Sequence, residues 1–217
     1  MESQIKQISY YKYPRTFHLP YSPKRGSDDK VLIDDSDFEG KYIVVLEKMD
    51  GENTTIYTNH LHARSIDSVK DESHRWLERF QNFIIPQLNQ FHNWRICGEN
   101  MFYKHTVSYQ DLESVFLGYS IWIENQENQN QESNYSLSWH ATKAILEKFE
   151  EYRNQKNRQV EGFVIRLESS FLYQDFSKSV AKYVCDDFEI TTNKHWRYEA
   201  KTLNQLRNNQ NIWTKIV

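Results

Sequence analysis

A lysine stands where an apolar, β-branched run gives way to a tight turn, in the sequence VVLEKMDGEN at residues 44–53. Lys48 attacks phosphorus only as the neutral amine, and the usual lysine pKa near 10.4 makes deprotonation at neutral pH cost roughly 4 kcal/mol. Nearby cations, a bound metal ion and burial lower that cost. Gly51 lets a ligand approach the backbone closely. The segment predicts a nucleophile at the floor of a nucleotide pocket; the alternative is an exposed lysine on a hairpin.

Four further charged residues stand inside apolar segments or at their ends. They are Arg64 in HLHARS, Glu99 in ICGEN, Glu161 in EGFVIR and Lys182 in SVAKYV. A charge within an apolar strand must find a partner, and carboxylates or phosphates are the usual ones. Taken singly, each residue also fits a surface charge or a structural ion pair.

The composition indicates a globular chain that is not broadly basic. The 217 residues carry a net charge of −3, with 38% hydrophobic and 15% aromatic residues. A local basic cleft for nucleic acid remains compatible with that charge, because affinity follows the patch. Cys97 and Cys185 form no CxxC pattern, which predicts a reducing compartment. With no apolar run near 18 residues and no signal peptide, we expect a soluble cytoplasmic protein.

Strand patterns dominate the sequence. We expect strands at 42–49, 54–58, 94–102, 115–123, 160–168 and 178–185. The MDGEN turn should join the first two as a hairpin. Because strands outnumber helices and do not alternate with them regularly, the fold class is α+β with a mostly antiparallel sheet.

Two segments have helical spacing of apolar residues. The first is 73–91, in which Pro86 should end or kink the helix, and the second is 138–153, with Ser138 as a plausible N-cap. Residues 1–30 contain prolines and polar residues and are expected to form an arm and loops. The Asn/Gln-rich tract 124–134 is expected to be a surface loop.

The order and separation of these segments resemble the covalent nucleotidyltransferase superfamily, which contains polynucleotide ligases and mRNA capping enzymes. KMDGEN is similar to its lysine motif KxDGxx, GEN to the third motif, EGFVIR to the fourth and AKYV to part of the fifth. Asn53, the FLGYSIW segment and the opening KYPRTFHLP look most like RNA ligases, nearest the phage and editing-type branch. The resemblance covers about residues 12–197.

The resemblance implies one minimal nucleotidyltransferase (adenylation) domain of the ATP-grasp-like ligase type over residues 1–217. An N-terminal arm would occupy 1–30 and a short extension 186–217. With some 35 residues left after Lys182, no OB-fold domain is expected. The implied activity is an ATP-dependent RNA ligase that joins 3′-hydroxyl and 5′-phosphate ends in RNA repair. ATP and RNA would be its partners, and an accessory RNA-binding protein remains open.

For the nucleotide, the resemblance implies roles for four residues. Lys48 would attack the α-phosphorus of ATP, expel pyrophosphate and hold AMP. Glu99 would bind the ribose hydroxyls, and Tyr119 would stack on the adenine. Glu47, immediately before the nucleophile, would lie near the adenine edge.

For phosphate, metal and RNA, it implies roles for four more. Lys182 would neutralise the α-phosphate, and Glu161 would help to hold Mg²⁺ or Mn²⁺. Asn53 would engage the RNA end in the later steps. Arg64 would contact the ribose or an RNA phosphate.

The sequence departs from the family pattern in two places. The fifth motif usually has two lysines two residues apart, whereas Val180 and Val184 flank Lys182 here. Lys178 has the same strand parity and is a candidate substitute. Tyr119 replaces a common phenylalanine, which preserves ring stacking.

Other segments keep two interpretations. Tyr13, Arg15 and His18 either touch nucleotide or RNA or belong to a packed arm. The segment 193–206, with Lys194 and Trp196, either contacts nucleic acid or forms a C-terminal cap. The alternative functions are a DNA ligase, a capping-type guanylyltransferase, or a non-catalytic nucleotide- or RNA-binding protein.

Overall fold

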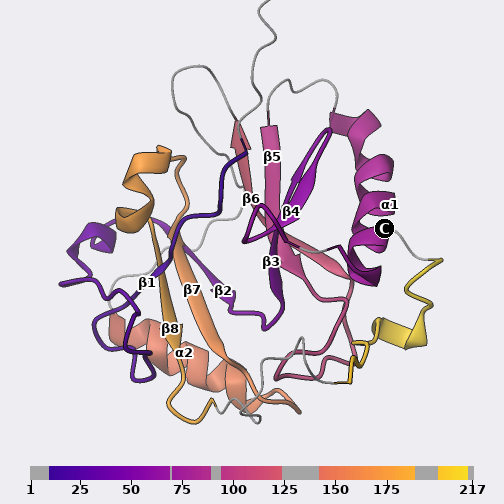
Figure 1. The fold of residues 1–217 in the computed structure, drawn as a ribbon. Coiled ribbons are helices and arrows are strands. Elements are labelled where there is room, and N and C mark those ends of the chain that lie inside the picture. Colours follow the sequence, from indigo (N-terminus) through magenta and orange to yellow (C-terminus); the bar gives the residue numbers. More distant parts are fainter. Residues whose placement is uncertain (1–9, 69, 89–93, 124–141, 189–199, 215–217) are drawn as a thin grey trace, which may run out of the picture.

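The computed structural model describes residues 10–68, 70–88, 94–123, 142–188 and 200–214. Within them the chain forms two four-stranded sheets that stand side by side, with a helix on the outer side of each (Figure 1). The first sheet has the order β1 (Phe17–His18), β8 (Val180–Val184), β7 (Gly162–Leu167) and β2 (Ile43–Glu47). The second has the order β4 (Leu61–Ala63), β3 (Glu52–Tyr57), β5 (Trp94–Asn100) and β6 (Phe116–Ile123).

The α+β prediction with mostly antiparallel strands is confirmed. β1 pairs with β8 in parallel, and the other pairings between the named strands are antiparallel. All six predicted strands are present, with ends shifted by a few residues. β1 and β4 were not predicted, since strands of two or three residues show no periodicity. β1 lies in the segment expected to be an arm and loops.

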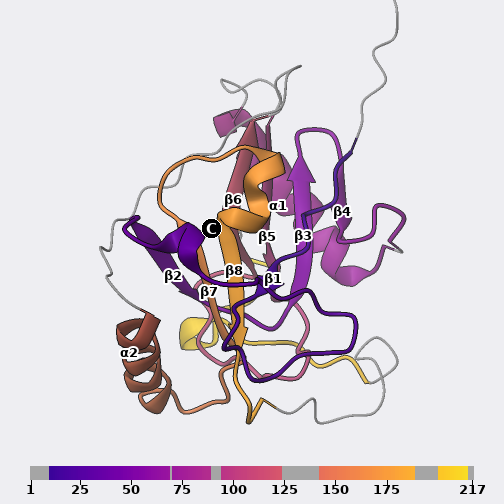
Figure 2. The ribbon, with the colours of Figure 1, turned by 90° about the vertical axis from the view of Figure 1, so that its left-hand side faces the viewer.

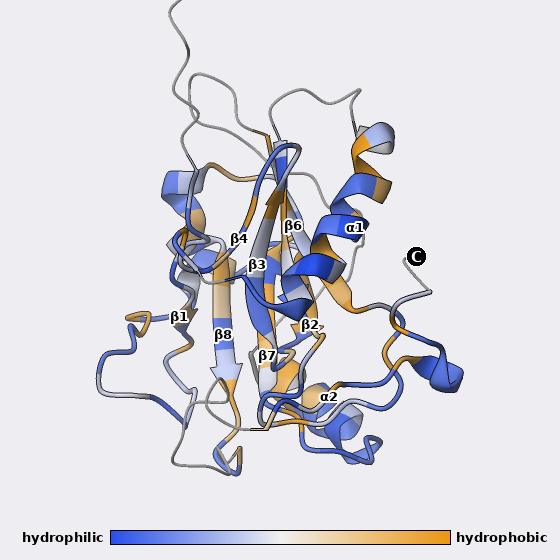
Figure 3. Cartoon of the chain, turned by 45° about the vertical axis from the view of Figure 1, so that its right-hand side comes forward, coloured by the Kyte–Doolittle hydropathy of each residue, from blue (hydrophilic) through white to orange (hydrophobic). Residues whose placement is uncertain are grey.

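The two helices each cover one sheet. α1 (Glu72–Leu88) buries Trp76 and Leu77, and the Phe80 ring lies 5.4 Å from that of Phe116 in the second sheet. α2 (Thr142–Asn154) places Phe149 4.8 Å from Phe163 in the first sheet. In Figure 2, α2 lies at the lower left and α1 lies behind the strands of the second sheet, and Figure 3 shows both hydrophobic and hydrophilic residues on α1.

Helix ends agree with the sequence in part. Pro86 lies in the last turn of α1, which ends at Leu88. α2 begins at Thr142, and Ser138, the tract 124–134, Lys194 and Trp196 lie outside the described residues. Short 3₁₀ helices occur at Ser36–Phe38, Tyr173–Lys178 and Arg207–Asn209. No helix in the described part of the chain is long and apolar enough to span a membrane.

The predicted hairpin between residues 42–49 and 54–58 is wrong. β2 pairs with β7 in one sheet, whereas both edges of β3 are occupied by β4 and β5 in the other. The Asp-Gly turn instead carries the chain across from the first sheet to the second. A Cβ on Gly51 would lie 2.7 Å from both the Asn100 carbonyl oxygen and the Met101 sulfur, so only glycine fits this crossing.

The C-terminal residues 200–214 dock beside the second sheet. The buried Asn204 side chain donates to the carbonyls of Met101 (2.9 Å) and Tyr103 (3.0 Å) and accepts from the Tyr109 backbone N–H (2.9 Å). The Trp76 indole donates to the Ile212 carbonyl at 2.7 Å. These contacts fix the connection between β5 and β6, which faces the candidate site.

Candidate active site

A cavity of about 980 Å³ opens between the two sheets. The first sheet contributes Leu46, Val164 and Lys182 to its wall, and the second contributes Asn53 and Tyr119. Seven of the eight predicted site residues line the cavity: Glu47, Lys48, Asn53, Arg64, Glu99, Tyr119 and Lys182. The eighth, Glu161, is not part of the cavity lining but contacts Lys48.

Lys48 and Glu161 form an ion pair. The Lys48 Nζ lies 2.7 Å from Glu161 Oε2, and the two side chains are 25% and 13% exposed. Lys48 follows β2, Glu161 precedes β7, and the backbone N–H of Lys48 donates to the Gly162 carbonyl at 2.9 Å. The antiparallel pairing of β2 with β7 therefore brings the two residues together from distant parts of the sequence.

Glu99 adds a second carboxylate near the lysine. It lies opposite Asn53 in the pairing of β3 with β5. Burial raises the pKa of Glu99 to about 8, although the charge of Lys48 opposes that shift. Burial likewise raises the pKa of Glu161. The carboxyl groups thus hold protons more readily than usual.

The charges that act most strongly on the Lys48 amine are carboxylates, whereas the sequence analysis expected nearby cations to lower its pKa. Burial lowers the pKa of Lys48, but the carboxylates of Glu161 and Glu99 outweigh burial and raise it above its usual value. The amine is therefore protonated at neutral pH. Positive charge placed nearby would favour its neutral form.

Lys182 projects from β8 and meets a carboxylate from the N-terminal arm. Its Nζ lies 3.2 Å from Asp29 Oδ1, and the other oxygen of Asp29 lies 3.2 Å from His18 Nε2. Burial lowers the pKa of Lys182, while Asp29 acts in the opposite direction. The candidate substitute Lys178 lies instead at the end of a 3₁₀ helix, exposed and outside the cavity lining, so its assignment to the strand is wrong.

Tyr119 is held on three sides. Its hydroxyl accepts a hydrogen bond from the Asn53 amide, its ring makes an edge contact with Tyr13 at 5.2 Å, and its carbonyl accepts from Arg166 Nη1 at 2.6 Å. The β5–β6 register shifts between Cys97 and Gly98, which leaves Tyr119 as the extra residue of a bulge. The bulge frees the Tyr119 carbonyl from the ladder.

The remaining predicted residues have varied surroundings. Arg64 follows β4 and is exposed at the cavity wall. Arg15 lines the cavity and pairs with Asp28 at 3.0 Å, whereas His18 is buried and contacts Ser22 and Asp29. These arm residues are packed beside the cavity.

Sequence reasoning missed several residues of the cavity wall: Asp29, Tyr109, Tyr152, Arg158 and Arg166. Arg166 belongs to EGFVIR and alternates with Val164, so strand periodicity contained a signal for it. The others come from loops and a helix without a local signal. Among the described residues, no group of three or more His, Cys, Asp or Glu side chains is arranged to hold a metal ion.

Comparison with known proteins gives one family. Neither the curated proteins nor the solved structures contain a match to this chain. A family model described as RNA ligase matches residues 41–184, the segment that carries Lys48, Glu99, Glu161 and Lys182. Since the match covers more than half of the sequence, the chain belongs to the RNA ligase family.

Proposed function

We propose that this protein is an ATP-dependent RNA ligase that works through lysyl-AMP and RNA-adenylate intermediates in RNA repair, with a covalent nucleotidyltransferase domain. The observation that carries the proposal is the position of Lys48 on a cavity of about 980 Å³, 2.7 Å from Glu161. Glu99 and Lys182 line the same cavity. Lys48, Lys182 and Glu99 therefore line one space large enough for a nucleotide, with Glu161 in contact with Lys48.

In the first step, the Lys48 amine attacks the α-phosphorus of ATP. A nitrogen–phosphorus bond forms, the bond to the bridging oxygen breaks, and pyrophosphate leaves with that oxygen. The amine must first lose a proton. Glu161 is in direct contact with Lys48 and has a raised pKa, so it is the proposed acceptor.

Glu161 fits a Mg²⁺ or Mn²⁺ ion, because it presents a carboxylate beside Lys48. Phosphate oxygens and water would complete its shell, as is usual for Mg²⁺. Such an ion supplies positive charge at the phosphate.

Residues from both sheets would make the remaining contacts with ATP. Tyr119 offers its ring to the adenine, and Glu99 offers its carboxyl group to the ribose. Lys182 would exchange its Asp29 partner for the α-phosphate. Glu47 is the exception among the expected base contacts, since its carboxylate is already bound by Arg158 and Tyr152.

In the later steps, AMP passes to an RNA 5′-phosphate and a 3′-hydroxyl then displaces it. The 3′ oxygen forms the new phosphodiester bond, and AMP leaves. The proposed contacts with the RNA ends are Asn53, which is hydrogen-bonded to the Tyr119 hydroxyl, and the exposed Arg64.

The first test is formation of a covalent adduct. Purified protein is incubated with Mg²⁺ and α-³²P-labelled ATP, GTP or NAD, and labelled protein is measured after denaturation. We expect labelling with ATP, loss of it in Lys48→Ala, and wild-type labelling in Lys178→Ala, since Lys178 is exposed outside the cavity. Labelling by GTP would indicate a capping enzyme, and no labelling at all a binding protein.

The second test identifies the polynucleotide. Nicked RNA, nicked DNA and single-stranded RNA, each with a 5′-phosphate, are offered with ATP. We expect sealing when the strand that ends in the 3′-hydroxyl is RNA. Equal sealing of all-DNA nicks would reject RNA specificity in favour of a DNA ligase.

A further inference from the structure

The residue before the nucleophile is held by side chains from a distant segment. Arg158 contacts both carboxylate oxygens of Glu47, with Nη1 2.5 Å from Oε1 and Nη2 3.0 Å from Oε2. The Tyr152 hydroxyl donates to the same carboxylate. The Arg158 and Glu47 side chains are 17% and 10% exposed. A two-point contact of this kind fixes both the position and the plane of the carboxylate.

The turn after the nucleophile is held from the other side. One carboxylate oxygen of Asp50 accepts from the backbone N–H groups of Thr106 (2.6 Å) and Val107 (2.8 Å). The Asp50 N–H donates to the Tyr109 hydroxyl at 3.0 Å. All three contacts come from the connection between β5 and β6.

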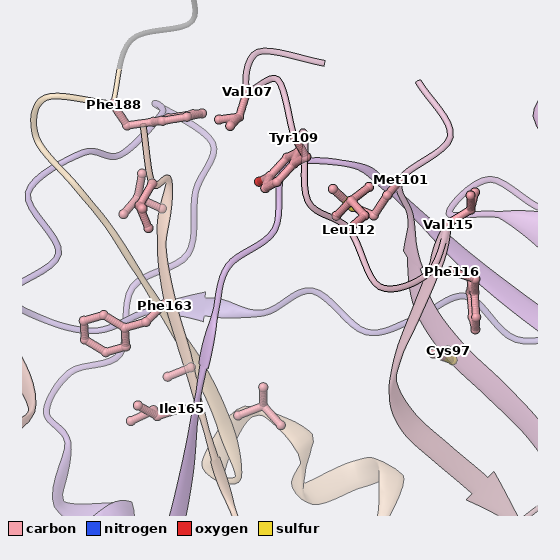
Figure 4. Close-up of a cluster of buried hydrophobic side chains, with 14 of the residues drawn as sticks. Cys97, Met101, Val107, Tyr109, Leu112, Val115, Phe116, Phe163, Ile165 and Phe188 are labelled. Atoms are coloured by element: carbon pink, nitrogen blue, oxygen red, sulfur yellow. The ribbon is translucent and has the colours of Figure 1, made fainter. Parts of the chain in front are cut away.

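The two sets of contacts meet. The Arg158 guanidinium lies 4.5 Å from the centre of the Tyr109 ring, at the distance of a cation–π contact. Tyr109 is fully buried, and Figure 4 shows it among Val107, Leu112 and Met101. Glu47, Arg158, Tyr109 and Asp50 thus form a closed chain of contacts around Lys48, which we call the nucleophile clamp.

We propose that Arg158 is a positioning residue for Lys48, acting through the nucleophile clamp; this inference rests on the proposed function. β2 ends at Glu47 and the Lys48 N–H still donates to the Gly162 carbonyl, but residues 49–51 belong to neither sheet. In-line attack on phosphorus requires the amine to be fixed to within a fraction of an ångström. A buried ion pair contributes little to stability by itself, but the forked arginine restricts geometry.

The test compares Arg158→Lys with a matched control. The variant keeps the charge and loses the two-point contact. Arg153→Lys makes the same change in the last turn of α2, where Arg153 pairs with Asp187 at 2.7 Å, away from the cavity. We expect single-turnover formation of lysyl-AMP at saturating ATP to fall about tenfold to a hundredfold in Arg158→Lys, with the ATP concentration for half-maximal rate changed less than about threefold. Arg153→Lys should match the wild type.

Hydrogen exchange gives a second readout that does not depend on catalysis. The amides of residues 47–51 should exchange faster in Arg158→Lys and at the wild-type rate in Arg153→Lys. If Arg158→Lys folds poorly, Glu47→Gln combined with Arg158→Met removes both charges, and the same two measurements apply. Faster exchange with a slower reaction supports the proposal.

Each of three results would contradict a different part of the proposal. Unchanged exchange in Arg158→Lys shows that Arg158 does not hold the segment. Faster exchange with a wild-type reaction rate shows that the clamp does not position Lys48. If wild-type protein forms no adduct with any nucleotide, the proposed function fails, while exchange still decides whether the clamp holds residues 47–51.

Discussion

The Lys48 amine lies 2.7 Å from the Glu161 carboxylate, close enough for the two groups to exchange a proton. The pKa of Lys48 and that of Glu161 are both raised, so the pair keeps the proton and the lysine is an ammonium ion at neutral pH. An ammonium ion has no lone pair for attack on phosphorus. In the proposed mechanism, the local charge must therefore change before Lys48 can attack, which makes the pair a point of control for the first step.

The raised pKa of Glu99 predicts a pH dependence of stability. A carboxyl group with a pKa of about 8 in the folded state and near 4.3 in the unfolded state binds more protons when folded over that interval. Stability must then fall as the pH rises from about 4.3 to 8. Glu99→Gln should remove this contribution, on the order of 1–3 kcal/mol after allowance for relaxation of the surrounding charges.

The measurement is the thermal midpoint at pH 5.5 and pH 8.5 for both proteins. We expect a larger drop for the wild type than for Glu99→Gln. Equal drops would show that Glu99 titrates normally. Glu113→Gln is a suitable control, because Glu113 is exposed and pairs with Arg207.

Substitutions of Tyr119 separate the contribution of its ring from that of its hydroxyl group. Tyr119→Phe keeps the ring and loses the contact of the hydroxyl with Asn53. We expect adduct formation within about threefold of wild type but slower sealing of RNA that is already adenylated, because Asn53 is no longer fixed. Tyr119→Ala should also weaken ATP binding by about 1–3 kcal/mol through loss of stacking.

A rapid-mixing assay with ATP and a sealing assay with adenylated RNA measure the two steps separately. Asn53→Ala is the matched variant, since it should lower sealing and leave adduct formation near wild type. A Tyr119→Phe protein that seals at the wild-type rate would show that the hydroxyl does not position Asn53.

The contact between Asp29 and Lys182 predicts that Asp29 competes with ATP for Lys182. The Asp29 carboxylate lies 3.2 Å from the Lys182 ammonium, in contact with the group proposed to bind the α-phosphate. Asp29→Asn removes the negative charge, so ATP should reach half-maximal adduct formation at about a threefold lower concentration. Lys182→Ala should act in the opposite direction. A loss of ATP affinity in Asp29→Asn would show that Asp29 instead orients Lys182.

The sequence predicted the long strands well, because alternation and β-branched residues are local signals. It could not predict which strand pairs with which. The Asp-Gly turn after Lys48 looks like a hairpin, yet Asp50 is bound by Thr106 and Val107, and β2 pairs with β7. Pairing depends on contacts between distant segments.

The site residues likewise differ in whether a local sequence signal reveals them. Lys48, Glu99 and Lys182 stand in or directly beside strands, so a sequence reading finds them and the sheets bring them to one cavity. Asp29 and Arg158 lie in polar connections without regular spacing. Their roles exist only through tertiary contacts with Lys182 and Glu47.

The last prediction concerns Gly51, where the chain crosses from the first sheet to the second. A Cβ at this position would lie 2.7 Å from the Asn100 oxygen and 2.9 Å from Glu99 Cγ, so Gly51→Ala forces the chain apart beside the site. We expect a loss of about 1–3 kcal/mol in the free energy of unfolding, as for other overpacked positions. Gly26→Ala is the control, since its nearest contact would be an ordinary 3.4 Å to Asp29. Urea unfolding of both variants measures the difference, and equal stability of the two would mean that the crossing has more room than the structure shows.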